Sequence, residues 1–367
     1  MEDEVILNKN IKATLFAKIK KAILLWLRLT NIPVVKVYHG YGNAEKIVVL
    51  GHVFSLSPLP RNRYRSGFGR NVFALLRSFL VVPVKDATVS TVWNGKIYTT
   101  TTAHDGFFRL ECYVFFPVPP GIHEVVVNFL QANNVTVKGT GWIVVPHQDQ
   151  LAFVSDIDDT FLVSHSANFI KKLYALFTKN AHTRKPFDGV VKHYQLLAAA
   201  QVKSDGANPF FYVSNSEWNL YDFIKEFCRK NNLPEGVYLL KQLKPFTKIL
   251  STGSAKHNNK FMRIARIIES YPSHRFVLFG DDSQMDPVIY ASIVDHFADR
   301  VVAVYLRHVY DKNTHNVNEL IEKIEAKGVP VCHFEHSKDA IEHSHRIGLL
   351  VGDIETITSQ LEKISIV

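Results

Sequence analysis

Three carboxylates follow a short apolar run near the middle of this 367-residue chain. The run covers residues 151–154 and leads into Ser-Asp-Ile-Asp-Asp-Thr at 155–160. A short apolar segment bounded by polar residues is typical of a buried strand. Asp156 and Asp158 are two residues apart, so on an extended chain their carboxylates share a face. Adjacent carboxylates repel unless a cation lies between them, and hard oxygen ligands favour Mg²⁺.

The same carboxylates allow other chemistry. A carboxylate can attack phosphorus as a covalent nucleophile, and a second one can move protons as a general acid/base. A strand that ends in a turn with solvated acids has the same Asp-x-Asp pattern, so the pattern needs support from elsewhere in the chain.

Two further apolar strands also end in polar clusters. Residues 210–213 lead into Ser214, Asn215 and Ser216, and residues 276–279 lead into Gly-Asp-Asp-Ser at 280–283, with an Asp at 286. The carboxyl ends of parallel strands lie at one edge of a sheet, where open α/β folds bind ligands. The combined set can hold Mg²⁺ between Asp156 and an acid near 281, and can bind phosphate through Ser214.

A lysine from the intervening helix would complete this set by neutralising charge in the transition state. Lys260 and Lys256 are both candidates. Each feature alone is ordinary, since a serine after a strand is usually a cap and a helical lysine is usually solvated. Their order, each at its own strand end, is the specific signal.

The elements that must position these residues alternate between strand and helix. We expect an α/β domain over residues 149–367 with a parallel, Rossmann-like sheet. The pattern predicts strands at 151–154, 209–213, 237–240, 275–279 and 301–305, and helices at 168–177, 191–200, 220–230, 259–270, 287–297, 316–326 and 354–364.

The preceding residues 34–148 have a different pattern. Many short strands separated by turn signals predict a small all-β, sandwich-like accessory domain. The expected strands cover 34–38, 46–50, 87–92, 96–101, 107–113 and 123–129. No His, Cys or acidic constellation in this region indicates catalysis.

Two basic segments and a net charge of +9 favour an anionic partner. Within residues 1–33, positions 9–29 predict a basic amphipathic helix, which either lies on an anionic membrane or packs on the protein's own body. Residues 61–77 carry five arginines interleaved with aromatic residues. They form either a phosphate-binding patch or a solvated loop that leads into a short helix.

Three dispersed cysteines (Cys112, Cys228 and Cys332) predict no disulfide framework and fit a reducing compartment. The N-terminal residues predict no secretory signal, and no apolar run is long enough to cross a bilayer. We therefore expect a cytoplasmic protein that associates peripherally with membranes.

Several of these segments resemble the haloacid dehalogenase superfamily, and more narrowly the App1-type phosphatidate phosphatase family, which is related to the lipin catalytic domain. The resemblance covers the whole second domain. It is carried by residues 155–160, Asn-Ala-His-Thr-Arg at 180–184 with Pro-Phe-Asp-Gly-Val at 186–190, residues 209–220, the helix of Lys260 with Tyr-Pro at 271–272, and residues 280–290. Residues 37–42 weakly resemble the start of that family's β-rich region.

The resemblance implies a Mg²⁺-dependent phosphomonoester hydrolase that forms an aspartyl-phosphate. Asp156 would be nucleophile and metal ligand, and Asp158 would be general acid/base while giving its carbonyl to the metal. Lys260 would neutralise charge, and Asp281 would be the metal ligand from the last motif. Substrate-binding residues would be Ser214, Asn215 and Thr160. The family often has Gly-Asp-Ser-Gly-Gln at positions 280–284, so the extra Asp282 leaves open whether Asp282 or Asp286 also contacts the metal.

The implied reaction converts phosphatidate to diacylglycerol and phosphate at a membrane surface, with no obligate protein partner. One alternative is a phosphatase for a soluble phosphomonoester or phosphoprotein. Another is a catalytically silent lipid-binding module, although such modules tend to lack the second acid, which is present here as Asp158. Nucleic-acid binding has only the basic charge in its favour, and no nucleic-acid partner is expected.

Overall fold

The computed structural model describes residues 22–59, 73, 77–131, 134–158, 160, 186–202, 206–243, 258–309 and 314–352. Several predicted features lie outside these residues. They are the start of the N-terminal helix, most of residues 61–77, the segment 180–184, Lys256, and the helices at 168–177 and 354–364. None of the described helices is long and apolar enough to cross a membrane.

The second half of the described chain forms a parallel sheet of six strands in the order β13-β12-β11-β14-β15-β16. All neighbouring pairs are parallel. This confirms the predicted α/β class with a parallel sheet. The strands are β11 (Leu151–Ser155), β12 (Phe210–Glu217), β13 (Gly236–Lys241), β14 (Arg275–Asp281), β15 (Val301–Arg307) and β16 (Val331–Phe334).

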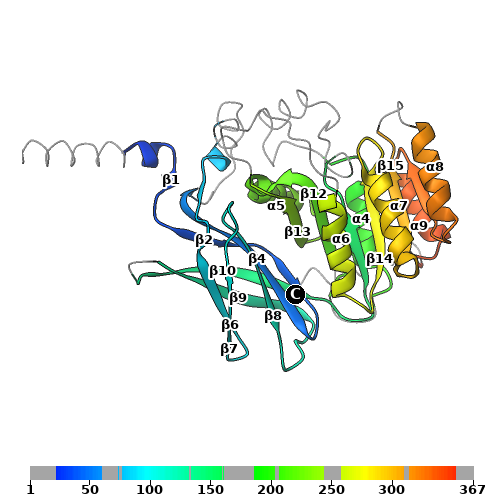
Figure 1. The fold of residues 1–367 in the computed structure, drawn as a ribbon. Coiled ribbons are helices and arrows are strands. Elements are labelled where there is room, and N and C mark those ends of the chain that lie inside the picture. The colour runs from blue at the N-terminus through cyan, green and yellow to red at the C-terminus, as the bar shows by residue number, and fades with distance from the viewer. Residues whose placement is uncertain are drawn as a thin grey trace, which may run out of the picture.

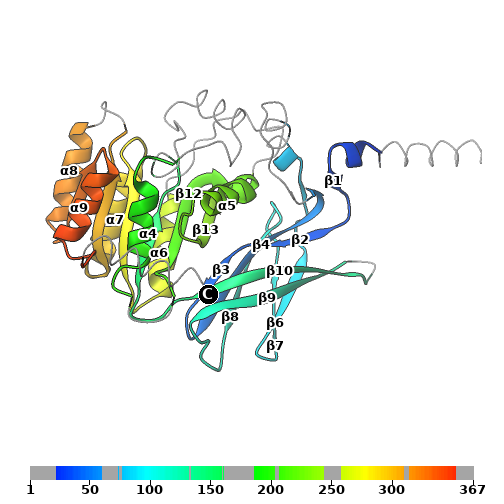
Figure 2. The ribbon, with the colours of Figure 1, turned by 180° about the vertical axis from the view of Figure 1, so that it is seen from behind.

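Helices cover both faces of this sheet (Figures 1 and 2). Helices α6, α7 and α8 pack side by side, and α4 contacts α9 on the other face. The helices are α4 (Val190–Ala198), α5 (Tyr221–Lys230), α6 (Asn258–Ser270), α7 (Asp286–Phe297), α8 (Thr314–Glu325) and α9 (Ser337–Arg346). Short 3₁₀ helices cover Trp218–Leu220 (η1) and Ala298–Arg300 (η3).

Strand β16 and helix α9 were not predicted from the sequence. Strand β16 has only four residues, and its apolar pattern is interrupted by His333. Helix α9 buries Ser337, Ala340, His343 and Ser344 rather than large apolar residues. Its sequence therefore lacks the apolar periodicity by which an amphipathic helix is recognised.

The first half of the described chain is largely β, as predicted. Ten strands form one sheet that is connected through β4, which pairs with β1, β2, β3, β5 and β8. The strands are β1 (Leu29–Thr30), β2 (Val34–Val37), β3 (Gly40–Gly42), β4 (Lys46–Pro58), β5 (Val82–Pro83), β6 (Thr88–Trp93), β7 (Lys96–Thr101), β8 (Phe107–Tyr113), β9 (Gly121–Leu130) and β10 (Thr136–Val145). Residues from β2, β4, β6, β8, β9 and β10 enclose one apolar core, which is the packing expected of a sandwich-like fold.

Strand β4 contributes to two cores because its side chains alternate between its faces. Ile47 and Val49 enter the core of the first sheet. Val48 and Leu50 join the core of the parallel-sheet region instead. The sequence Ile-Val-Val-Leu is apolar on both faces because each face of the strand is buried in a different core.

Aromatic side chains fix the two regions to each other. The ring of Tyr38 stacks on Trp218 with a centroid separation of 4.2 Å, and Tyr41 meets Phe211 edge-on at 6.0 Å. The backbone N–H of His39 donates to the hydroxyl of Tyr221, and the side chain of Asn43 donates to the carbonyl of Ser270 at 2.7 Å. The interface combines aromatic packing with specific hydrogen bonds, so the two regions form one packed body.

Trp218 is the centre of this interface, since it also stacks on Phe107. We expect Trp218→Ala to lower the free energy of unfolding by about 3–5 kcal/mol, because truncating a buried aromatic leaves a cavity. Denaturant unfolding checks this. The matched control is Trp142→Ala, whose side chain is 44% exposed and which should change stability by less than about 1 kcal/mol. Equal losses in the two variants would show that the interface contributes little.

Candidate active site

The candidate site lies where the strand order of the parallel sheet reverses. From β11 the chain goes on to β12 on one side, whereas β14 pairs with β11 on the other side. Open α/β sheets bind ligands at such a switch point, beyond the carboxyl ends of the strands. The backbone N–H of Asp156 donates to the carbonyl of Phe279 at 2.8 Å, so the loop after β11 starts in a fixed position against β14.

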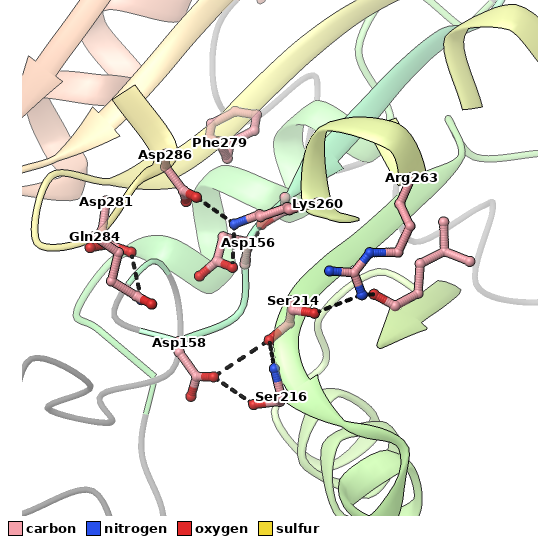
Figure 3. Close-up of polar contacts among 12 residues, drawn as sticks. Asp156, Asp158, Ser214, Ser216, Lys260, Arg263, Phe279, Asp281, Gln284 and Asp286 are labelled. Atoms are coloured by element: carbon pink, nitrogen blue, oxygen red, sulfur yellow. Dashed lines mark hydrogen bonds and ion pairs between the residues drawn. The ribbon is translucent and has the colours of Figure 1, made fainter. Parts of the chain in front are cut away.

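A buried lysine lies between two carboxylates at this point (Figure 3). The Nζ atom of Lys260 is 2.7 Å from Oδ1 of Asp156 and 2.5 Å from Oδ1 of Asp286. Lys260 belongs to the first turn of α6, and Asp286 begins α7. The structure therefore joins Lys260 to Asp156 of the Asp-x-Asp motif.

Asp281 completes a group of three acids. Asp156, Asp281 and Asp286 are all buried, and one carboxylate oxygen of each lies within 4.8 Å of the others. Ser283 donates both its backbone N–H, at 2.8 Å, and its hydroxyl to Oδ1 of Asp281. This group includes Asp286, which the sequence had left open together with Asp282. The side chain of Asp158, predicted as a ligand through its carbonyl, is not in the group.

The charges of the group are unbalanced. Burial first, and then the neighbouring Asp286 and Asp158, raise the pKa of Asp156 to about 8 although Lys260 lowers it. Burial, Asp286 and Asp156 also raise the pKa of Asp281 well above its ordinary value. Burial lowers the pKa of Lys260, but Asp156 and Asp286 outweigh this and raise it, so the lysine is charged. With all acids ionised, one ammonium neutralises only one of three carboxylates.

The residues present fit a hard divalent cation. Oδ2 of Asp156 and Oδ2 of Asp286 are buried and accept no hydrogen bond from any described residue. A buried carboxylate oxygen without a partner is costly, and an ion provides one. The donors are all carboxylate oxygens, which Mg²⁺ prefers. The group could therefore hold a metal ion.

Asp158 lies on the opposite side of the site (Figure 3). Its Oδ2 accepts a hydrogen bond from the hydroxyl of Ser216 at 2.6 Å and a longer one from Ser214 at 3.5 Å. The register of β12 against β13 shifts between Val213 and Glu217. Ser214 and Ser216 are two residues apart, so their hydroxyls share a face of the strand and both reach Asp158. The backbone N–H of Ser216 also donates to Oγ of Ser214.

Arg263 supports the same segment from helix α6. Its Nη1 donates to the carbonyl of Ser214 at 3.0 Å and to the carbonyl of Leu239 at 3.1 Å. Lys260 and Arg263 are three residues apart, so they share a face of the helix. That spacing was the available sequence signal for Arg263, which we did not predict.

Thr160 and Asn215 are the remaining predicted site residues, and their surroundings differ. Thr160 is buried, its carbonyl accepts from Nε of Arg307 at 2.9 Å, and its hydroxyl has no hydrogen-bond partner among the described residues. Asn215 is half-buried in β12 between Ser214 and Ser216, where alternation directs it to the other face of the strand. Ser216 is the residue that sequence reasoning underrated.

Gly280 is required by close packing rather than by its backbone angles. A Cβ at this position would lie 2.5 Å from Oδ2 of Asp286 and 2.7 Å from the ring of Tyr290. The Tyr290 hydroxyl is itself held by the carbonyl of Phe279 at 2.6 Å. The glycine before Asp281 therefore lets α7 approach β14 closely enough to deliver Asp286.

Comparison with known proteins shows which family this region of the chain is similar to. Residues 151–308 match the family described as phosphatidate phosphatase APP1, catalytic domain. The chain is 28% identical over 158 residues to phosphatidate phosphatase APP1 of Saccharomyces cerevisiae, covering 43% of this chain and 26% of that protein. It is 22% identical over 243 residues to an uncharacterized protein of Schizosaccharomyces pombe, covering 63% of this chain and 39% of that one. The chain thus spans less than half the length of either relative.

Solved structures show weaker likenesses. A bacterial immunoglobulin-like domain from the ice-binding adhesin of M. primoryensis is 17% identical, with a TM-score of 0.18, and the match covers 31% of this chain and 96% of that one. A carbohydrate acetylesterase from Xanthomonas citri is 8% identical, with a TM-score of 0.31, over 86% of this chain and 73% of that one. Neither likeness carries an argument about function.

The second region is a doubly wound α/β domain with an acidic site at its switch point. Within that class, residues 151–308 match the APP1 phosphatidate phosphatase catalytic-domain family.

The excess negative charge of the three carboxylates should make the stabilisation of the fold by a cation depend on pH. The pKa of Asp156 is raised from 3.8 to about 8 in the folded protein, so between these values the folded state holds a proton that the unfolded state has released. Stability without a cation should therefore fall as pH rises through this window, and Mg²⁺ should offset the loss. The Mg²⁺-induced rise in melting temperature should be larger near pH 8 than near pH 5. Asp156→Asn should flatten this difference, and an equal Mg²⁺ effect at both pH values in the wild type would contradict the assignment.

A second prediction concerns Gly280. In Gly280→Ala the added methyl group should displace Asp286, because it meets that carboxylate and the Tyr290 ring. We expect the affinity for Mg²⁺ to fall at least about ten-fold, the scale seen when a residue supporting a metal site is lost. Titration calorimetry measures the affinity, circular dichroism checks the fold, and Ser292→Ala on the outer part of α7 is the control. Unchanged Mg²⁺ binding would exclude Asp286 from the metal group.

Proposed function

We propose that this chain is a Mg²⁺-dependent phosphomonoester hydrolase acting through an aspartyl-phosphate, with phosphatidate as its substrate. The observation that carries the proposal is the buried group of Asp156, Asp281 and Asp286 around Lys260. Its place in a domain of the APP1 phosphatidate phosphatase family supports the substrate. The name of the yeast relative supports the same substrate, although this chain covers only 26% of that protein.

The carboxylates of Asp156, Asp281 and Asp286 would hold Mg²⁺, with the backbone carbonyl of Asp158 as a further ligand. When bound, the ion would neutralise charge on the phosphate and draw its oxygens towards Asp156. It would also replace the missing positive charge in the group and keep the carboxylates ionised at neutral pH.

Asp156 is the proposed nucleophile. Its Oδ1 is held by the ammonium of Lys260, which leaves Oδ2 without a hydrogen-bond partner among the described residues. In the first step an oxygen of Asp156 forms a bond to phosphorus while the bond to the leaving alcohol oxygen breaks. The second ion pair of Lys260, with Asp286, restricts the position of the ammonium, so the lysine orients the nucleophile and neutralises phosphate charge.

Asp158 is the proposed general acid/base. It gives a proton to the leaving alkoxide in the first step, and in the second it takes a proton from the water that attacks phosphorus and frees Asp156. The hydroxyls of Ser216 and Ser214 hold its carboxylate apart from the metal group. This separation suits the role, because a proton carrier needs to avoid the cation that keeps the other acids ionised. The proposed phosphate-binding residues are Ser214, Thr160 and, through its backbone N–H, Asn215.

The N-terminal residues support action at a lipid surface. The described part of the N-terminal helix, residues 22–26, exposes Leu25 and Trp26, whose exposed fractions are 62% and 73%. Large apolar side chains on a basic amphipathic helix favour peripheral association with an anionic membrane. We propose such an association for a cytoplasmic protein, whose three cysteines are all buried and free.

Phosphate release from phosphatidate vesicles tests the reaction. The wild type should release phosphate with Mg²⁺ and not with a chelator. Asp156→Asn should abolish turnover, and Asp158→Asn should reduce it about 10²–10⁴-fold because it loses proton transfer. Asp295→Asn, an exposed carboxylate of α7, is the matched control and should keep wild-type activity.

The outcomes separate the alternatives. Vesicle binding without Mg²⁺-dependent release from any phosphomonoester would identify a lipid-binding module. A higher kcat/KM on soluble phosphomonoesters or phosphoproteins than on vesicles would leave the site chemistry standing and overturn the lipid substrate.

A further inference from the structure

A second cluster of titratable side chains lies on the outer strands, next to the site described above. Asp282 follows β14, His308 follows β15, and His333 lies in β16. Oδ2 of Asp282 is 2.5 Å from Nδ1 of His308 and 3.0 Å from Nε2 of His333. These donor atoms all lie within 4.8 Å of one another. The proposed mechanism uses none of the three.

We propose that Asp282, His308 and His333 form a second cation site that selects a borderline transition metal such as Zn²⁺. Zn²⁺ accepts two imidazoles and one carboxylate as ligands, whereas Mg²⁺ does not favour the imidazole nitrogens. The neighbouring group of Asp156, Asp281 and Asp286 has only oxygen donors. The two sites therefore differ in chemistry although Asp281 and Asp282 are adjacent in the chain.

The carboxylate of Asp282 is held in a fixed orientation. Its side chain is almost fully buried, and its Oδ1 accepts the backbone N–H of Val309 at 2.8 Å. The oriented carboxylate directs Oδ2 towards ring nitrogens of both His308 and His333.

Binding of Zn²⁺ would require the three ligand side chains to move apart only slightly. Tetrahedral ligands about 2.0–2.1 Å from Zn²⁺ are about 3.3 Å from each other. The two nitrogen–oxygen separations of 2.5 and 3.0 Å would therefore each widen by less than about an ångström. The side chains of His308 and His333 are 27% and 23% exposed, so they have room to move.

Binding at this site would join the ends of three neighbouring strands. Strand β15 pairs with both β14 and β16, and His333 lies opposite Leu306 in the register of β15 and β16. The backbone N–H of Asp282 already donates to the carbonyl of Arg307 at 3.0 Å. A cation there would fix the end of β14, which carries Asp281, from its outer side.

Zn²⁺ titration of the full chain in excess Mg²⁺ tests the proposal, because Mg²⁺ occupies the oxygen-only group. The wild type and Asp156→Asn should each bind one Zn²⁺ more than the double variant His308→Gln/His333→Gln, whose affinity at this site should be at least about 100-fold lower. His296→Gln, an exposed histidine of α7, is the matched control and should bind as the wild type does. Circular dichroism and the Mg²⁺-induced thermal shift check that the double variant is folded.

Co²⁺ in place of Zn²⁺ gives an independent readout, because its visible absorption reports nitrogen ligation. The wild type should show a spectrum that the double variant lacks. Equal Zn²⁺ binding by the wild type and the folded double variant would overturn the proposal and leave the cluster as an ion-pair network. Phosphatase activity does not enter either measurement, so this result is separate from that of the proposed hydrolase.

Discussion

The ion pairs of Lys260 with Asp156 and Asp286 are the interaction on which the site depends. Helix α6 lies between β13 and β14 in the chain. Its Lys260 contacts Asp156 in the loop after β11 and Asp286 at the start of α7, so the ammonium joins these two segments. A buried ion pair is costly to form and more costly to break, because removing one partner leaves an uncompensated charge. The lysine therefore fixes two of the three acids, and a cation would complete the balance of charge.

Strand β14 serves two sites because adjacent residues at its end project in different directions. Asp281 faces the acids around Lys260, whereas Asp282 meets the imidazoles of His308 and His333. Both acids follow Gly280, whose lack of a side chain admits Asp286 and the ring of Tyr290. The proposed hydrolase chemistry does not use the extra carboxylate at position 282, and its contacts with His308 and His333 give it a separate role.

The alternating strands and helices predicted the α/β class, and polar residues at three strand ends predicted most of the site. Asp286 remained uncertain in the sequence because its position depends on how closely α7 approaches β14. Ser216 was underrated although it lies two residues after Ser214, and this alternation along β12 was the available signal that both hydroxyls share a face. Strand β16 and helix α9 were missed because one is very short and the other buries small and polar residues.

The irregular end of β12 connects the first region to the candidate site. Ser214 and Ser216 hold Asp158, and Trp218 follows them directly in a 3₁₀ turn. Trp218 is stacked against Tyr38 and Phe107 of the first region. An irregular strand end has fewer ladder hydrogen bonds to fix it, so the aromatic packing from the first region supplies the restraint. The β-rich region therefore supports the position of the proposed general acid/base through β12, without contributing a side chain to the metal group.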